Sequence, residues 1–202
     1  FAGNGIWISF LIAAFVAILT GFSYAELSSI YEDDSGEYSY IYHTFGKKLA
    51  FIIGFIVLLA GIIGTSAVAL GFAGYFNSLF GFNNLIITAI SIVILFLLIN
   101  LNGIKKSMKI NELFTLLSIL GLVFIIALAI PKFGSVNYFD YTSIKGIFKA
   151  SSLIFFAYLG FDSIIQLSEE TKNAKKNIPK ALLMSIVIST IIYILVAFAC
   201  IS

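Results

Sequence analysis

A glycine and a carboxylate lie two residues apart within an aromatic stretch of an otherwise apolar segment. The stretch reads Phe155-Phe156-Ala157-Tyr158-Leu159-Gly160-Phe161-Asp162. A helix interrupted here would leave carbonyl groups free where its first half ends and N–H groups free where its second half begins. Such groups suit an ammonium and a carboxylate, the two charges of a zwitterion. The pattern therefore indicates a binding site built from backbone groups.

Asp162 would lie at the positive end of the second half-helix. One interpretation is a helix N-cap, in which the carboxylate accepts backbone N–H groups. The other is direct contact with the substrate. The two roles are compatible.

A second set of polar residues, Asn111, Thr115 and Ser118, follows the spacing of one helix face. The hydroxyls of Thr115 and Ser118 would either bond to carbonyls of their own helix or face a water-filled path.

These residues lie in a chain whose composition requires lipid. Of its 202 residues, 60% are hydrophobic and 11% are charged, and the mean hydropathy is +1.07. A soluble domain carries about a quarter charged residues. All twelve cationic residues are Lys, whereas nucleic-acid readers normally show Arg and a basic face. No nucleic-acid partner is therefore expected.

The chain contains no recognisable catalytic or metal-binding set. Cys200 is the single cysteine and His43 the single histidine, so a Cys-rich or paired-His site is not expected. We predict that the protein is not an enzyme, and that it needs no metal or cofactor beyond a coupling H⁺ or Na⁺.

Apolar runs of about 20 residues predict an all-α, polytopic membrane protein. We expect one incomplete transmembrane domain over 1–202 that lies in the lipid bilayer. The chain starts at Phe1 and stops within an apolar run, which suggests a piece of a longer protein. The six expected spans are 3–29, 48–76, 84–103, 110–131, 144–169 with a break near 156–161, and 179–202.

The fifth span has a short charge-free core, since only the 12 residues from Ala150 to Phe161 lie between its charged residues. It is either a re-entrant or surface helix, or a crossing helix that is broken midway. If it crosses, loops 26–48, 102–112 and 167–180 share one side with nine Lys, against three on the other. If the fifth span does not cross, the two sides carry five and seven Lys. The positive-inside rule favours six crossings with the Lys-rich loops in the cytoplasm. Within the first loop, Glu32, Asp33 and Asp34 are expected to be solvated.

Several motifs resemble amino acid–polyamine–organocation (APC) transporters. Ser23-Tyr24-Ala25-Glu26-Leu27 is similar to the end of the family's second helix, and Ser35-Gly36-Glu37-Tyr38-Ser39-Tyr40 to the stretch before the third. Gly64-Thr65-Ser66-Ala67-Val68-Ala69 is similar to the third helix of the cationic amino-acid transporter branch. Phe156 to Asp162, with Glu169-Glu170, Lys172-Asn173 and Ile178-Pro179-Lys180-Ala181, resembles the sixth helix and the following loop.

The resemblance implies a partial LeuT-type fold of inverted repeats, of which this chain would be helices two to seven. It implies a secondary transporter of amino acids or related amines in the cell membrane, coupled to H⁺ or Na⁺. Thr115 and Ser118 would then be candidates for the coupling site. Phe156 would be an aromatic gate, and the substrate would bind along Phe156, Ala157, Tyr158, Leu159 and Gly160. Asp162 matches an acidic position linked to protonation in some relatives.

Two departures from the family's pattern weigh against lysine-based proton coupling and against a strictly cationic substrate, respectively. Some proton-coupled members have a lysine three residues after the fifth-helix threonine, where this chain has Ser118 after Thr115. Bacterial cationic members often read leucine-glutamate-tyrosine in the third helix, where this chain has Leu59-Ala60-Gly61.

The alternative function is a membrane amino-acid sensor or channel-like protein of the same fold.

Overall fold

A computed structural model describes residues 1–31 and 34–202, so Glu32 and Asp33 of the predicted acidic loop lie outside the described residues. The described residues form helices and no strand. They divide into two compact units, which are described separately. Unit 1 comprises residues 1–45 and 120–202, and unit 2 comprises residues 46–119.

Unit 1 contains α1 (Ile6–Ile30) with the 3₁₀ turn η1 (Gly3–Gly5), α2 (Glu37–Phe45), the end of α5 (Ile104–Ala129) with η2 (Ile130–Lys132), α6 (Ile144–Ile154), η3 (Phe155–Tyr158), η4 (Phe161–Leu167) and α7 (Ala174–Ile201). Unit 2 contains α3 (Lys47–Phe80), α4 (Leu85–Leu101) and the first part of α5.

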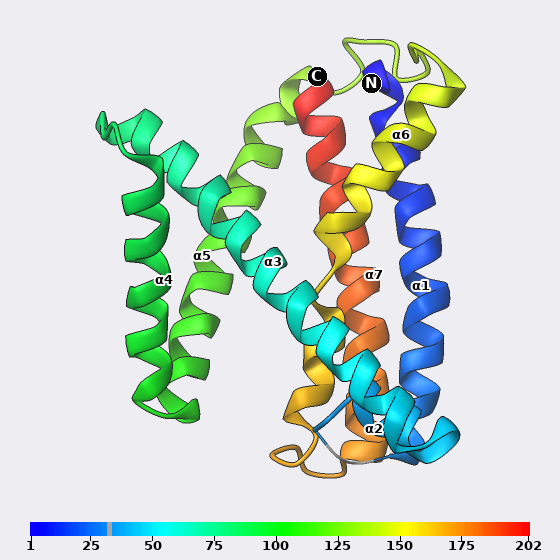
Figure 1. Cartoon of the computed structure of the whole chain (residues 1–202). Coiled ribbons are helices and arrows are strands. Elements are labelled where there is room, and N and C mark those ends of the chain that lie inside the picture. Colours follow the sequence, from blue (N-terminus) through cyan, green and yellow to red (C-terminus); the bar gives the residue numbers. More distant parts are fainter. Residues whose placement is uncertain (32–33) are drawn as a thin grey trace. The chain divides into compact units, whose positions relative to one another are not determined.

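Helices α1 and α7 form the antiparallel centre of unit 1, and both chain ends lie at the same end of this pair (Figure 1). Ala13, Ala17 and Gly21 recur every four residues along α1 and are buried. Small residues at this spacing let two helix backbones approach closely, which is how helices associate in lipid. Gly21 is the closest point, because an added Cβ there would collide with Cδ1 of Ile186 on α7.

We expect Gly21→Leu to lower the free energy of unfolding by about 1–3 kcal/mol, because it overpacks this contact. Ile186 is only 2% exposed and has no solvent into which to move. Thermal melting of the purified protein in detergent measures the effect. Adding Ile186→Ala should restore part of the loss by making room. Equal melting of Gly21→Leu and the wild-type protein would contradict this packing.

The broken segment runs along α1 in the same direction. Ser9 of α1 donates to the carbonyl of Ile147 in α6 at 3.0 Å, and further along Tyr24 of α1 meets Phe161 edge-on, with ring centroids 5.8 Å apart. The two halves of the segment are thus fixed to one continuous helix.

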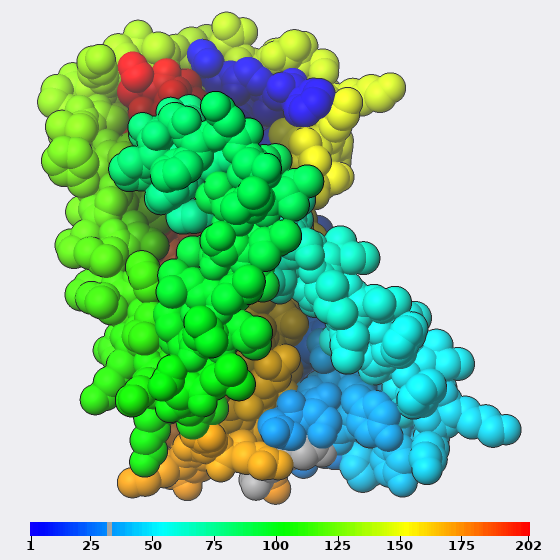
Figure 2. Space-filling model, turned by 60° about the vertical axis from the view of Figure 1, so that its left-hand side comes forward, coloured from blue at the N-terminus to red at the C-terminus, as the bar shows by residue number. Residues whose placement is uncertain are grey.

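In unit 2 the apolar helices α3 and α4 pack against each other and form adjoining cyan and green surfaces in Figure 2. As the sequence predicts, the chain turns within 77–84: Gly81 ends α3 with a left-handed φ of 72°, and the Asn84 side chain caps α4 by accepting the N–H of Ile87 at 3.1 Å. Gly81 suits this turn because φ is positive.

The all-α prediction with a discontinuous fifth span is confirmed. In the described ranges, five helical stretches are long and apolar enough to cross a membrane. The remaining apolar helix, α4, has 17 residues, which is the lower limit for a crossing. The sixth crossing therefore stays a prediction. The five long stretches are Gly3–Ile30, Lys47–Phe80, Ile104–Lys132, Ile144–Leu167 and Ala174–Ile201.

Three expected boundaries differ from those observed. α5 begins at Ile104 rather than 110, α7 begins at Ala174 rather than 179, and loop 26–48 contains α2. The predicted spans begin and end at charged residues, because these residues leave the lipid. Backbone hydrogen bonding does not depend on lipid, so the helices extend past them. Pro179 therefore lies inside α7 rather than before it, and its missing N–H removes one helical hydrogen bond.

Candidate functional site

The chain leaves helical geometry between Tyr158 and Phe161. Leu159 is extended, with φ −63° and ψ 148°, and Gly160 is left-handed, with φ 104°. A residue with a Cβ rarely adopts this φ, so the glycine that the sequence singled out is the residue that permits the break.

Two side chains replace the backbone hydrogen bond that the break removes. In a continued 3₁₀ helix the N–H of Gly160 would donate to the carbonyl of Ala157. Instead, the Gly160 N–H donates to Asp162 Oδ1 at 3.1 Å, and the Ala157 carbonyl accepts from the Tyr193 hydroxyl at 2.9 Å. The break is therefore a defined structure in which the Gly160 N–H and the Ala157 carbonyl each have a partner.

Asp162 has a different local role from the predicted N-cap. Gly160 occupies the cap position of η4, and Asp162 lies in the first turn. Its half-buried carboxylate turns back to the N–H of Gly160 rather than forward into η4. This direction follows from the extended Leu159, whose ψ of 148° turns the next N–H away from the preceding turn. Its protonation role stays a prediction.

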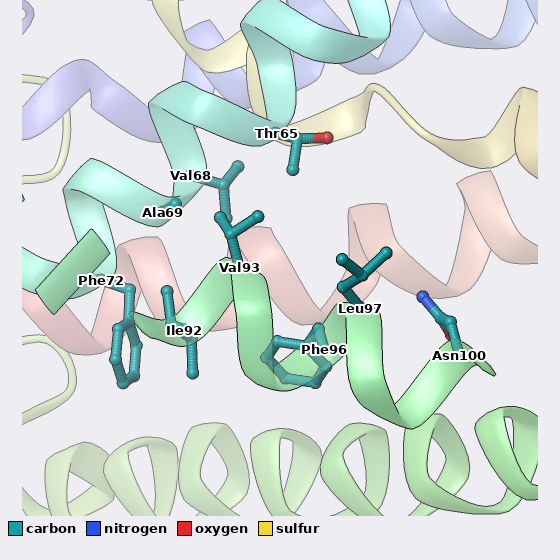
Figure 3. A pocket seen from close by; sticks show the side chains of 9 residues that line it. All are labelled: Thr65, Val68, Ala69, Phe72, Ile92, Val93, Phe96, Leu97 and Asn100. Carbon is teal, nitrogen blue, oxygen red and sulfur yellow. The ribbon is translucent and has the colours of Figure 1, made fainter. Parts of the chain in front are cut away.

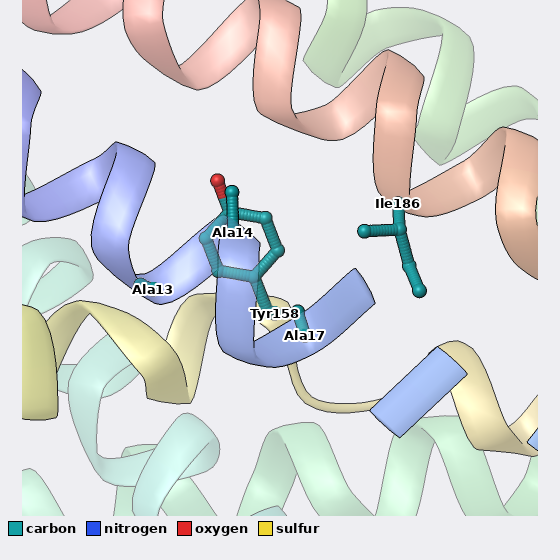
Figure 4. Packing of buried hydrophobic residues seen from close by; sticks show 5 residues of the cluster. All are labelled: Ala13, Ala14, Ala17, Tyr158 and Ile186. Carbon is teal, nitrogen blue, oxygen red and sulfur yellow. The ribbon is translucent and has the colours of Figure 1, made fainter. Parts of the chain in front are cut away.

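Tyr158 fixes the end of η3 against α1. Its side chain is 5% exposed and packs with Ala13, Ala14 and Ala17 of α1 and with Ile186 of α7 (Figure 4). Its hydroxyl lies 3.4 Å from the carbonyl of Phe10. The neighbouring Phe156 side chain is 51% exposed. The segment thus has one face held by α1 and α7 and one face that is open.

A cavity of about 230 Å³ lies between the break and α7. Four of the five residues predicted to bind substrate line it, namely Ala157, Tyr158, Leu159 and Gly160. Phe156 does not, and its gating role stays a prediction. Thr115 and Ser118 are exposed residues of α5 in unit 2, and their coupling role likewise remains a prediction from sequence.

Sequence reasoning missed the α7 side of this cavity. Ser185, Ser189 and Tyr193 line it from α7 at a spacing of four residues. The same search for polar residues on one helix face that identified Thr115 and Ser118 would have found them.

A larger cavity, about 560 Å³, lies between α3 and α4 within unit 2 (Figure 3). Its lining is apolar except for Thr65 and Asn100, and none of the predicted site residues belongs to it. Both helices are regular where they line it, so it offers no free backbone groups to a zwitterion. The smaller cavity at the break is chemically the better candidate site.

The long apolar helices define a multi-pass membrane protein, and the break inside one of them is its candidate site. The chain belongs to the amino acid permease family, which matches residues 1–202 in full. The APC-type resemblance is thus confirmed. The family's matched relatives are permeases and transporters, in agreement with the prediction that the chain is not an enzyme.

Individual relatives carry several substrate names. The chain is 34% identical to the branched-chain amino acid permease BcaP of Bacillus subtilis, over 97% of this chain and 47% of that protein. It is also 34% identical to the methylthioribose transporter of Bacillus subtilis, with the same coverage. It is 27% identical to cationic amino acid transporter 1 of Arabidopsis thaliana, over 97% of this chain and 36% of that protein. The chain therefore spans about half or less of the length of these curated relatives.

Proposed function

We propose that this chain is part of a secondary transporter that moves amino acids or related amines across the cell membrane by alternating access. The observation that carries the proposal is the helix break at Leu159 and Gly160 inside an apolar segment. Free backbone dipoles within a membrane are tolerated only where protein or a water-filled cavity surrounds them. In broken-helix transporters this arrangement binds the charged groups of the substrate.

In this proposal the substrate binds in the cavity between the break and α7, which Ala157, Tyr158, Leu159 and Gly160 line. Carbonyls at the end of η3 would receive the ammonium of the substrate, and the first N–H groups of η4 would receive its carboxylate. Movement would be coupled to H⁺ or Na⁺, with Asp162, Thr115 and Ser118 as candidates. The Lys-rich loops 26–48, 102–112 and 167–180 would face the cytoplasm.

Uptake by the full-length protein in liposomes tests the proposal. Labelled leucine and arginine are the first probes, because relatives are named for branched-chain and cationic substrates. We expect accumulation under an imposed proton or sodium gradient. Absence of uptake for all twenty amino acids and the common polyamines under both gradients would refute it. Binding without accumulation would favour the alternative, a membrane sensor.

We expect Phe156→Ala to weaken retention of substrate, because a half-exposed aromatic ring beside the break would otherwise cover the bound molecule. The predicted result is a severalfold higher KM with a smaller change in kcat, measured by initial uptake in liposomes. Phe148→Ala is a matched control, because Phe148 is an exposed phenylalanine of α6 before the break. Wild-type binding and uptake in Phe156→Ala would remove Phe156 from the gate.

A further inference from the structure

The hydrogen bond from Tyr193 to Ala157 joins two elements that are far apart in sequence. Tyr193 lies on α7 and Ala157 on η3, and their hydroxyl and carbonyl oxygens are 2.9 Å apart. As described above, this bond stands where the Gly160 N–H would donate if the helix continued. The hydroxyl therefore compensates the carbonyl that the break exposes.

The ring of Tyr193 is held in place by two other aromatic side chains. It meets Tyr158 edge-on, with centroids 5.2 Å apart, and Phe10 of α1 at a tilted angle, with centroids 5.8 Å apart. Aromatic pairs at these separations are favourable. Because the ring is fixed, its hydroxyl reaches the carbonyl with little loss of rotamer freedom.

Fixing one carbonyl fixes the peptide groups beside it. The planar peptide unit that carries the Ala157 oxygen also carries the N–H of Tyr158. Its orientation therefore sets where the chain enters Leu159 and Gly160. A carbonyl oxygen has two lone pairs, so Ala157 retains the capacity to accept a second donor while it is bonded to Tyr193.

We propose that Tyr193 is a positioning residue of the substrate site, whose hydroxyl takes the place of the Gly160 N–H on the Ala157 carbonyl and so holds the break in its binding shape. This inference rests on the proposed transport function, because the substrate of the site is the molecule that the protein would transport. It assigns α7 a role in the site, because α7 both supports the break and forms a wall of the cavity beside it.

Tyr193→Phe tests this role because it removes the hydroxyl and keeps both ring contacts. In the full-length protein in liposomes, we expect KM for labelled leucine, or for arginine if that is the better probe, to rise about five- to tenfold. The turnover rate per inserted protein should change less than twofold. A merely structural role would lower the amount of folded protein and leave KM unchanged. Tyr75→Phe, at a tyrosine that is 79% exposed in unit 2, should keep the wild-type KM.

Hydrogen–deuterium exchange of the purified protein gives a second readout that needs no substrate. We expect Tyr193→Phe to speed exchange in peptides covering 155–162 and to leave peptides of α3 unchanged. Unchanged exchange at the break, or unchanged KM in a transporting protein, overturns the proposal. If the wild-type protein moves no substrate, the proposed function fails, and exchange at 155–162 alone decides whether Tyr193 holds the break.

Discussion

Replacing Gly160 by Ala should reduce uptake more than tenfold. Gly160 has φ 104°, and a residue with a Cβ is held in such a conformation at a cost of about 1–3 kcal/mol. Because 1.4 kcal/mol is about a tenfold change in an equilibrium, the variant should populate the native break only weakly. Space is not the obstacle, since no heavy atom lies within 4 Å of an added Cβ.

The expected structural consequence follows from the hydrogen bond at this residue. A return of φ to negative values would swing the Gly160 N–H away from Asp162 Oδ1, 3.1 Å away in the native break. It would also change the angle between η3 and η4. The ammonium and the carboxylate of a bound substrate would then both lose their backbone partners. We therefore expect kcat/KM to fall by more than the loss of either partner alone would cause.

Initial uptake in liposomes, normalised to inserted protein, measures the effect. Gly121→Ala is the matched control, because Gly121 lies inside α5 with negative φ and has open space at its Cβ. Gly160→Asn should fall between Ala and wild type, since Asn tolerates positive φ better than other residues with a Cβ. Wild-type uptake in Gly160→Ala would show that transport does not need this backbone conformation.

The break itself was predictable from sequence because its cause is local. A glycine two residues before a carboxylate, with too few apolar residues around them for a continuous crossing, indicated where helical geometry ends. Gly160 and Asp162 carry the consequence in the structure. Hydropathy located the spans for a similar reason, since burial in lipid depends on a run of residues rather than on their partners.

The partner of the break was not predictable in the same way. Tyr193 reaches Ala157 across 36 residues, and this pairing depends on how α7 packs against α1. That packing in turn depends on Gly21 and Ile186, whose complementarity has no signature in either segment alone. Likewise, α2 was expected as loop because its sequence is polar, whereas Tyr40 is buried in the cluster with Ile165 and Leu182.

Asp162→Ala should reduce uptake about tenfold, because the N–H of Gly160 would lose a charged acceptor. A hydrogen bond to a charged group contributes about 1.5–3 kcal/mol. Asp162→Asn should lose much less, since its amide oxygen can still accept the Gly160 N–H. This order of effects, wild type above Asn above Ala, follows from the 3.1 Å contact alone.

Measuring uptake against pH separates this local role from a role in proton coupling. If the carboxyl of Asp162 carries the coupling proton, Asp162→Asn transports without the wild-type response to an imposed pH gradient, even where its rate at neutral pH is close to normal. A wild-type pH profile in Asp162→Asn would exclude Asp162 from coupling and leave it as the acceptor that holds Gly160. Equal uptake by the Ala and Asn variants would contradict the hydrogen-bond argument, because only Asn preserves an acceptor at that position.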